Sequence, residues 1–502
     1  MGASKAGKPR AMDAVQRALL LRTPVAADRV LYLGEAGAAF ADAVQARNPR
    51  TEVLLGAADE APVDVLAADD LGRLLADPAA AALLERTHIL TTAIAPAEAD
   101  PGALLASLTA RGFTLLHLQP AEESKQYFDD CTQDLVSAWE AGGLPGVQPP
   151  RALIVVARRG EGRGPRLMVA MLTFSPELMD IRTRLPAEAM RSEPEILLQH
   201  IRTPARLPPA PVEQPKIAIL QRPAKPTDLD GWRRSMLARI REGWVTVMEF
   251  DDHPELTAKT NQHEVDEADW IRFSCAHAVQ TSTPLLLDLF RRHNPETRAF
   301  PNAAFRLEKF PEQMPKRVFY GAVSRGEHAV EVARSIGPVV AAFPGVEFVV
   351  AGDRAVFEAL PTARKRYHDI VPYEDYLKLM GGCAVSLSPI EANEHNAAKS
   401  DAKFLDAAAR GVLTIASPTI YADVISHGEN GLIAPEVSDW APMLTEALRD
   451  HDASRRMARN AWNYVRERRM FAHQVKARHD WYRHLWNRRV ELNAALLARM
   501  RD

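Results

Sequence analysis

The chain has few of the residues that mark a disulfide-stapled, nucleic-acid-binding or membrane-spanning protein. Its three cysteines (Cys131, Cys275 and Cys383) are odd in number and far apart, which argues against a disulfide framework or a zinc site and predicts reduced thiols in the cytoplasm. A net charge of −3 leaves no basic field, so nucleic acid is not an expected partner. No apolar run reaches the length of a transmembrane helix, although contact with a membrane surface stays compatible with the sequence.

The start of the chain also lacks the pattern of a signal peptide. Met1 to Arg10 is basic, but no apolar region with a cleavage site follows, so we expect a flexible segment over residues 1–28. The whole sequence is 47% apolar and 25% charged, as in globular proteins with a sizeable core. A length of 502 residues has room for about three domains.

The most informative stretch runs from Ala384 to Pro418. An apolar run at 384–387 predicts a strand, 388–398 is polar and predicts a loop, and 399–410 has the composition of a helix. Gly411 fits the residue that ends this helix, and a second strand is expected at 412–416. So long a crossover predicts that the two strands are parallel.

Three charged residues of the predicted helix share one face. Lys399, Lys403 and Asp406 are spaced at i, i+4 and i+7. Two lysines in the first turns oppose the helix dipole, and an anion held at that end would explain them. The alternative is a solvated cluster in which these lysines pair with Asp401 and Asp406, and spacing alone does not separate the two hypotheses.

The same stretch resembles the donor-site motif of group 1 glycosyltransferases, an α/β family with the two-lobed GT-B fold, and most closely its spore-coat-type branch. The motif is N-x-x-K-S-x-x-K-x-x-E followed by A-A-x-G-x-P-V-x-A-S. It stands here as Asn396, Lys399, Ser400, Lys403, Asp406, Ala408, Ala409, Gly411, Ala416 and Ser417. Asp406 replaces the usual Glu, and Leu413 stands at the proline position.

The resemblance implies a role for each of these residues toward a nucleoside diphosphate sugar. Asp406 would bind the ribose, and Lys399 would neutralise the leaving diphosphate. Asn396, Ser400 and Lys403 would complete the donor site. The earlier Glu of the family falls on Ala398, so Glu391 or Glu394 would contact the donor sugar in its place.

A glycine-bounded loop precedes this motif in the sequence. Gly321 to Gly326 (G-A-V-S-R-G) lies between an expected strand at 317–320 and an expected helix at 327–336. Backbone N–H groups of such a loop, with Ser324 and Arg325, can bind diphosphate oxygens. The loop is similar to the G-x-x-x-x-K-G loop of group 1 enzymes.

The first glycosyltransferase lobe is expected from Arg166 onward. Strands are predicted at 167–172, 216–220, 245–250 and 270–274, with helices at 229–242 and 284–292. Asp251, Asp252 and His253 could hold a divalent metal, but adjacent acids do not match the alternating D-x-D of metal-dependent glycosyltransferases. We therefore predict no metal site and no required cofactor.

The N-terminal part resembles a degenerate S-adenosylmethionine-dependent methyltransferase domain of Rossmann type. A strand at 29–33 runs into G-E-A-G-A-A-F and a helix, but Tyr32 stands at the position of the motif's acid, and Ala36 and Ala38 replace two glycines. Without those glycines the backbone cannot approach the cofactor closely. A scaffolding or docking role is favoured over methyl transfer.

The resulting prediction is an α/β protein with a small Rossmann-like domain and two Rossmann-like GT-B lobes. The expected domains are 29–160, the acceptor lobe 166–305, the donor lobe 306–470 and a C-terminal helix 471–502. The expected reaction is sugar transfer to a glycan, lipid-linked or protein acceptor, with retention and without metal. The alternatives are a methyltransferase acting through the N-terminal domain, and a non-catalytic sugar- or partner-binding protein on a decayed GT-B frame.

Overall fold

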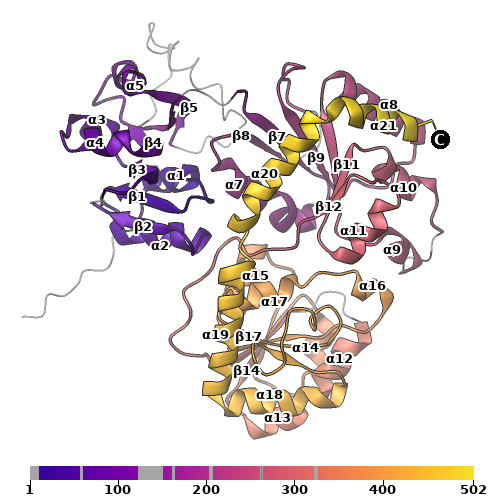
Figure 1. The fold of residues 1–502 in the computed structure, drawn as a ribbon. Helices are drawn as coiled ribbons and strands as arrows, with labels where there is room; N and C mark the ends of the chain where they lie inside the picture. The colour runs from indigo at the N-terminus through magenta and orange to yellow at the C-terminus, as the bar shows by residue number, and fades with distance from the viewer. Residues whose placement is uncertain are drawn as a thin grey trace, which may run out of the picture. The chain divides into compact units, whose positions relative to one another are not determined.

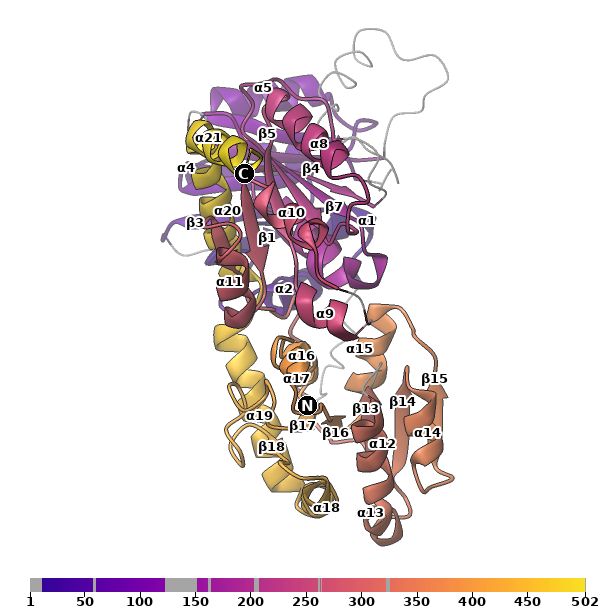
Figure 2. The same cartoon turned by 90° about the vertical axis from the view of Figure 1, so that its right-hand side faces the viewer.

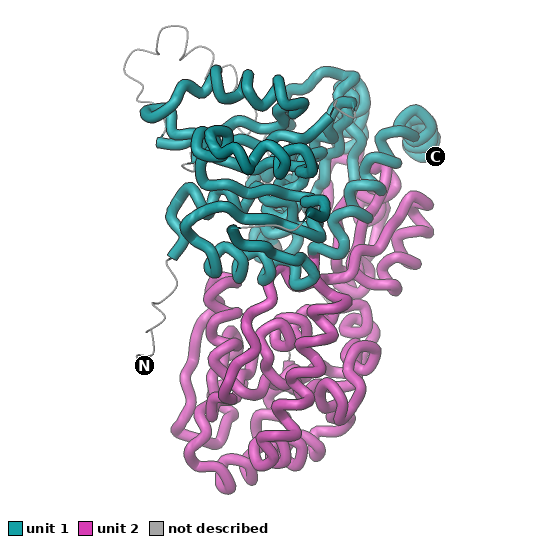
Figure 3. Tube along the Cα trace, turned by 60° about the vertical axis from the view of Figure 1, so that its left-hand side comes forward, with its two compact units in different colours: residues 1–224, 230–247, 472–502 teal, residues 225–229, 248–471 magenta. Residues whose placement is uncertain are grey.

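The computed structural model describes residues 11–56, 60–121, 151–160, 164–202, 207–260, 262, 264–321 and 326–501. Cys131, Ser324 and Arg325 lie outside these ranges. Within the ranges, the strands form three six-stranded sheets, shown in Figures 1 and 2, which confirms the predicted α/β fold class with Rossmann-like sheets. The chain divides into two compact units, residues 1–224, 230–247 and 472–502 in one and 225–229 and 248–471 in the other (Figure 3).

The first sheet lies in the first unit and has the order β2-β1-β3-β4-β6-β5. β1, β2, β3 and β4 are parallel, while β6 runs antiparallel to both β4 and β5. Apolar side chains are buried on both faces, against α1 and α2 on one and against α3, α4 and α5 on the other. The bounds are α1 Ala14–Arg22, β1 Arg29–Leu33, α2 Gly37–Arg47, β2 Glu52–Leu55, β3 Val63–Ala68, α3 Leu71–Ala76, α4 Ala80–Glu85, β4 Thr87–Ile94, α5 Pro101–Ala110, β5 Phe113–Pro120 and β6 Leu153–Arg159.

The second sheet has the order β12-β11-β10-β9-β7-β8. β7 is parallel to β8 and β9, and β11 is parallel to β12. The bounds are β7 Leu167–Thr173, a 3-10 turn at Pro176–Leu178, a π-helical turn at Asp180–Arg184, α7 Leu185–Arg191, β8 Ile196–Ile201, β9 Lys216–Gln221, α8 Leu229–Arg241, β10 Val245–Glu249, α9 Pro254–Thr260, α10 Glu267–Ser274, β11 Ala278–Thr281, α11 Pro284–Arg291 and β12 Thr297–Ala299.

The third sheet has the order β15-β14-β13-β16-β17-β18, and all five of its pairings are parallel. In chain order this is 3-2-1-4-5-6, the doubly wound arrangement whose switch point lies between the first and fourth strands. One face buries a large apolar cluster under α12, α13, α18 and α19, and the other packs on α15 and α17. The parallel pairing of the strands around Gly411 is confirmed, since β16 and β17 pair over 385–388 and 413–416.

The remaining bounds in the second unit are those of the third sheet and its helices. They are β13 Arg317–Gly321, α12 Gly326–Ser335, α13 Gly337–Ala342, β14 Glu347–Ala351, α14 Arg354–Ala359, β15 Lys365–His368, α15 Tyr373–Gly381, β16 Val385–Ser388, α16 Glu394–Ala397, α17 Ala402–Ala408, β17 Leu413–Ala416, β18 Leu432–Ile433, a 3-10 turn at Val437–Asp439, α18 Trp440–Arg449 and α19 His451–Arg468.

Two strand predictions are wrong. Residues 270–274 belong to helix α10, because Asp266 and Asp269 form a capping box that starts a helix there. The sequence also predicts a strand at 369–371, but the strand of the structure lies earlier, at Lys365–His368, where it pairs with β14, and Ile370 is 78% exposed.

The C-terminal segment is helical as predicted but forms two helices. α20 spans Ala472–Asn487 and α21 spans Arg489–Arg499, with Arg488 at the break. Their near-helical spacing in the sequence predicts that Val475, Tyr482, Trp486 and Val490 pack in the core. The first three are buried, whereas Val490 is 74% exposed.

Two further observations concern membranes and thiols. Among the helices that the structure describes, none combines the length and the apolar character that crossing a bilayer requires. Cys275 and Cys383 are buried and form no disulfide, and burial raises the pKa of the Cys383 thiol to about 12.

Candidate functional site

The predicted donor-site residues gather at the carboxyl edge of the third sheet. β13 ends at Gly321 and β16 ends at Ser388, on either side of the switch point, which is the place where ligands bind in doubly wound sheets. Gly321 is required here, because a Cβ atom would lie 2.5 Å from Phe319 Cε1 and 2.8 Å from Tyr376 Oη. The strand therefore ends against aromatic side chains with no room for another side chain.

Lys403 connects this glycine to the predicted motif. Lys403 is the second residue of α17, and its Nζ donates to the carbonyl oxygen of Gly321 at 2.5 Å. The ammonium also lies 5.7 Å from the centre of the Tyr376 ring. Two residues 82 positions apart, both predicted to bind the donor, are thus brought together.

The helix of the motif is shorter than predicted. α17 begins at Ala402 rather than at Lys399, because Asp401 carries non-helical dihedral angles and its carbonyl accepts from Phe404 N at 3.0 Å. Lys399 and Ser400 therefore lie in the turn before the helix and do not share a helical face with Lys403. The helix also ends earlier than predicted, at Ala408 with Ala409 as its C-cap, whereas Gly411 adopts the expected left-handed conformation with a φ of +67°.

A short helix, α16, occupies part of the expected loop and positions the acidic residues. The Asn393 side chain caps it by accepting from Asn396 N at 2.9 Å. The Asn396 side chain donates to the carbonyl of Glu391 at 3.0 Å, and Asn393 donates to the Glu391 carboxylate at 3.1 Å. Glu391 and Glu394 are exposed, and Asn396 acts on the conformation of this turn.

Asp406 forms a contact that the sequence did not predict. Its Oδ1 accepts from the Tyr373 hydroxyl at 2.6 Å. Burial raises the pKa of Asp406 to about 6, against the opposing charge of Arg410. Burial and the neighbouring Asp406 together raise the pKa of Tyr373 well above its usual range. The spacing of the motif gave no sign of Tyr373.

Two residues that follow strands of the second sheet lie close to α16 and the residue after it. His395 Nε2 is 3.8 Å from Asp252 Oδ1, and the Thr283 hydroxyl lies 3.5 Å from the carbonyl oxygen of Ala398. Burial and the charge of Lys399 lower the pKa of His395. Among the residues that the structure describes, no group of His, Cys, Asp and Glu suited to a metal ion is found.

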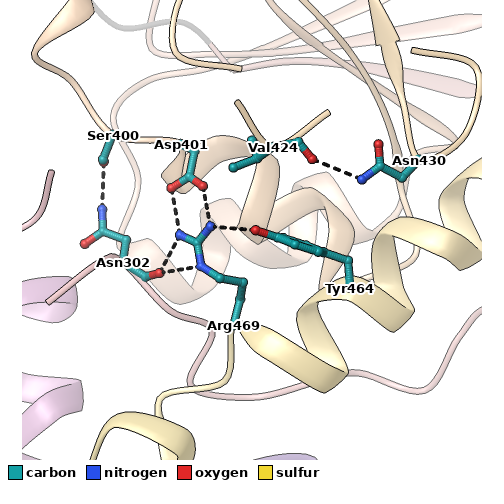
Figure 4. A network of polar contacts seen from close by, with 7 residues as sticks. All are labelled: Asn302, Ser400, Asp401, Val424, Asn430, Tyr464 and Arg469. Atoms are coloured by element: carbon teal, nitrogen blue, oxygen red, sulfur yellow. Dashed lines mark hydrogen bonds and ion pairs between the residues drawn. The ribbon is translucent and has the colours of Figure 1, made fainter. Parts of the chain in front are cut away.

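Ser400 and Asp401 are held by residues that sequence reasoning missed, drawn in Figure 4. The Asn302 side chain donates to Ser400 Oγ at 2.7 Å. Arg469 forms an ion pair with Asp401, with Nη1 2.7 Å from Oδ2. No local sequence pattern signals these contacts, because the partners are 98 and 68 residues apart.

A cavity of about 690 Å³ lies elsewhere in the second unit. Its walls come from α18, the start of α19 and residues 427–432. His427 precedes β18, so this cavity lies toward the amino ends of the strands and contains none of the predicted site residues.

The switch point of the first sheet is arranged differently. Tyr32 at the end of β1 donates to Asp69 Oδ1 at 2.6 Å, and Asp69 Oδ2 accepts from the Gln16 side chain at 2.9 Å. A Cβ atom on Gly34 would lie 2.3 Å from Tyr32 Oη. Burial and the hydrogen bond to Asp69 raise the pKa of Tyr32, which keeps its proton. The glycine turn that would approach a cofactor is covered by the protein's own side chains.

Comparisons with known proteins agree with the motif. Residues 331–481, less than a third of the chain, match the family model described as "Glycosyl transferase-like". No curated protein matches the sequence significantly.

Solved structures with similar folds include HepE of Anabaena in complex with UDP and glucose, at 13% identity over 62% of this chain and 98% of that chain, with a TM-score of 0.46. Sucrose-phosphate synthase from Thermosynechococcus elongatus is 15% identical over 64% of this chain and 100% of that chain, with a TM-score of 0.47. A TarM mutant of S. aureus is 10% identical over 54% and 55%, with a TM-score of 0.40. The family model confirms the predicted resemblance over its matched range: residues 331–481, which carry Lys399, Lys403 and Asp406, form a glycosyltransferase-like segment.

Proposed function

We propose that the chain transfers a sugar from a nucleoside diphosphate sugar to a glycan, lipid-linked or protein acceptor. One observation carries the proposal: the Lys403 ammonium lies at the switch point of a doubly wound sheet, against the glycine that ends β13. A cation at this edge suits an anionic nucleotide, because ligands of such sheets bind where the strand order reverses. The glycosyltransferase-like match over residues 331–481 supports the same assignment.

The proposed reaction depends most on electrostatic stabilisation of the leaving diphosphate, because negative charge develops there as the bond to the sugar breaks. Lys399 and Lys403 supply positive charge in this proposal, with Arg325 and Ser324 of the preceding loop. Gly321, Asn396 and Ser400 shape the backbone around the diphosphate. With two ammonium groups available, the reaction is proposed to need no metal ion.

The sugar and the ribose are assigned to acidic residues. Glu391 or Glu394 contacts the transferred sugar, and Asp406 binds the ribose together with Tyr373, whose hydroxyl already lies 2.6 Å from the Asp406 carboxylate. Retention at the anomeric carbon follows from the resemblance to the group 1 lineage.

A non-catalytic binding protein is the second candidate, because Asp406 is engaged by Tyr373 and Ala398 stands at the position of the family's earlier acid. Incubation with UDP-, GDP- and dTDP-sugars, with release of the nucleoside diphosphate as the readout, separates the two functions. Slow donor hydrolysis that Lys399→Ala abolishes supports transfer. Binding of a diphosphate without any turnover would favour the non-catalytic candidate, and no binding of any of the three would reject the proposed transfer.

A further inference from the structure

Two connecting segments of the second unit run side by side. Ala304 N donates to the carbonyl of Arg469, and Phe471 N donates to the carbonyl of Ala304, both at 2.8 Å. The rings of Phe305 and Phe471 stack with centroids 4.8 Å apart. The first segment leads toward β13 and the second follows α19, so the chain enters and leaves the third sheet through this pair.

The guanidinium of Arg469 extends from this pair of segments and uses all five of its N–H groups (Figure 4). Nη1 and Nη2 bind the two carboxylate oxygens of Asp401 at 2.7 and 3.0 Å. Nη2 and Nε bind the carbonyl of Asn302 at 2.8 and 3.3 Å, and Nη1 reaches the Tyr464 hydroxyl at 3.2 Å. Bidentate pairing of this kind fixes geometry as well as charge.

Asp401, the ion-pair partner of Arg469, lies at the start of the helix that carries Lys403. Asp401 immediately precedes α17, and an Asp there ordinarily caps the helix with its side chain. The Asp401 carboxylate makes no such bond to the helix and pairs with Arg469 instead, where both side chains are only 12–13% exposed. Asn302 adds a second link through its 2.7 Å hydrogen bond to Ser400 Oγ.

We propose that Arg469 is a positioning residue for the donor diphosphate: through Asp401 and Asn302 it fixes the segment from Lys399 to Lys403. This inference rests on the proposed function. The lysines lie on either side of the anchored residues 400 and 401, so a loosened anchor moves both ammonium groups relative to Gly321. The anchor also ties the donor site to the paired connections of the sheet.

The test compares Arg469→Ala and Arg469→Lys with Arg468→Ala, whose side chain is exposed one residue earlier. UDP, GDP and dTDP are titrated by calorimetry, and amide hydrogen exchange is measured over residues 396–405. We expect both Arg469 variants to exchange faster over this segment and to bind the preferred diphosphate about 10-fold or more weakly, because Lys cannot form the two-pronged contact. Arg468→Ala should change neither quantity.

The results distinguish a failure of the Arg469 proposal from a failure of the proposed function. Unchanged exchange in folded Arg469 variants overturns the proposal whether or not a nucleotide binds, whereas failure of the wild type to bind any of the three diphosphates rejects the proposed function. Faster exchange with unchanged affinity also overturns it, since the ion pair would then be structural only. If the Arg469 variants do not fold, Asn302→Ala removes the side-chain link to Ser400, and the proposal then requires a weaker diphosphate affinity in this folded variant.

Discussion

The switch points of the first and third sheets share a strand-and-glycine pattern but differ in the side chains that surround the glycine. In both, a buried parallel strand ends at a glycine whose surroundings leave no room for a Cβ atom. Gly34 directly follows β1, and Gly321 is the last residue of β13. At Gly34 the nearby Tyr32 and Asp69 satisfy each other, whereas at Gly321 a lysine ammonium approaches the edge of the sheet. The strand and glycine therefore predict the turn, and the side chains above the turn decide whether a ligand has a place there.

The largest expected effect comes from removing a cation near the carboxyl edge of the third sheet, which tests whether this switch point binds an anionic ligand. Lys399→Ala should weaken binding of the nucleoside diphosphate on the order of 10- to 150-fold, the range for loss of a charge-assisted hydrogen bond, and should leave the bare nucleoside nearly unaffected. Calorimetric titration of both ligands checks this. Lys378→Ala is the matched control, because Lys378 pairs with Asp375 on the exposed face of α15. Equal diphosphate affinities in wild type and Lys399→Ala would support the solvated-cluster hypothesis.

Asp406→Ala should act on the other half of the nucleotide. If Asp406 and Tyr373 bind the ribose, the variant loses affinity for the diphosphate and the nucleoside alike, by roughly 10-fold or more. Titration with both ligands, with circular dichroism to verify folding, gives the result. A loss confined to the diphosphate would place Asp406 near the phosphates and contradict the ribose assignment.

Sequence reasoning predicted most of the scaffold, because its signals are local. The alternation of apolar runs with polar turns located β13, β16 and β17 of the third sheet, and Gly411 marked the turn after α17 through its left-handed conformation. An error arose where two local signals disagree. The composition of residues 270–274 predicts a strand, but the capping box at Asp266 starts a helix that includes them.

The site was predictable only in part. Gly321, Lys399, Lys403 and Asp406 came from motif spacing. The contacts of Tyr373 to Asp406, of Asn302 to Ser400 and of Arg469 to Asp401 span 33, 98 and 68 residues of sequence. Such contacts depend on how the strands are ordered in the sheet, which one sequence does not reveal. The start of α17 was misjudged for the same reason, since Asp401 pairs with the distant Arg469.

The raised pKa of Asp406 predicts a smaller, pH-dependent effect on stability. Because the folded-state pKa is about 6 and the unfolded value is near 4, the folded state binds more protons between these values. Lowering the pH from 7.5 to 5 should therefore stabilise the wild type relative to Asp406→Asn by about 1 kcal/mol. Urea unfolding of both proteins at the two pH values measures the difference. A stability difference that does not change with pH would show that Asp406 stays ionised in the folded protein.

Chelation tests whether cations of the protein replace a metal. In the proposed site Lys399 and Lys403 supply the charge at the diphosphate, so donor hydrolysis in EDTA should stay within about twofold of the untreated rate, because charge stabilisation by these groups is independent of free metal. A metal-free buffer with added Mg²⁺ or Mn²⁺ is the control. Loss of activity in EDTA with rescue by either ion would turn attention to Asp251 and Asp252.

The smallest expected effect belongs to the first sheet: S-adenosylmethionine should not bind at all. Its crevice between β1 and β3 is occupied by the hydrogen bonds of Asp69 to Tyr32 and Gln16, and breaking them would leave buried polar groups unpaired. Calorimetry and thermal shift on the full chain should show no response, while the nucleoside diphosphate gives one in the same preparation. Micromolar binding of S-adenosylmethionine would mean that these side chains move aside for a ligand, and the two switch points would then differ in their ligands rather than in whether they bind one.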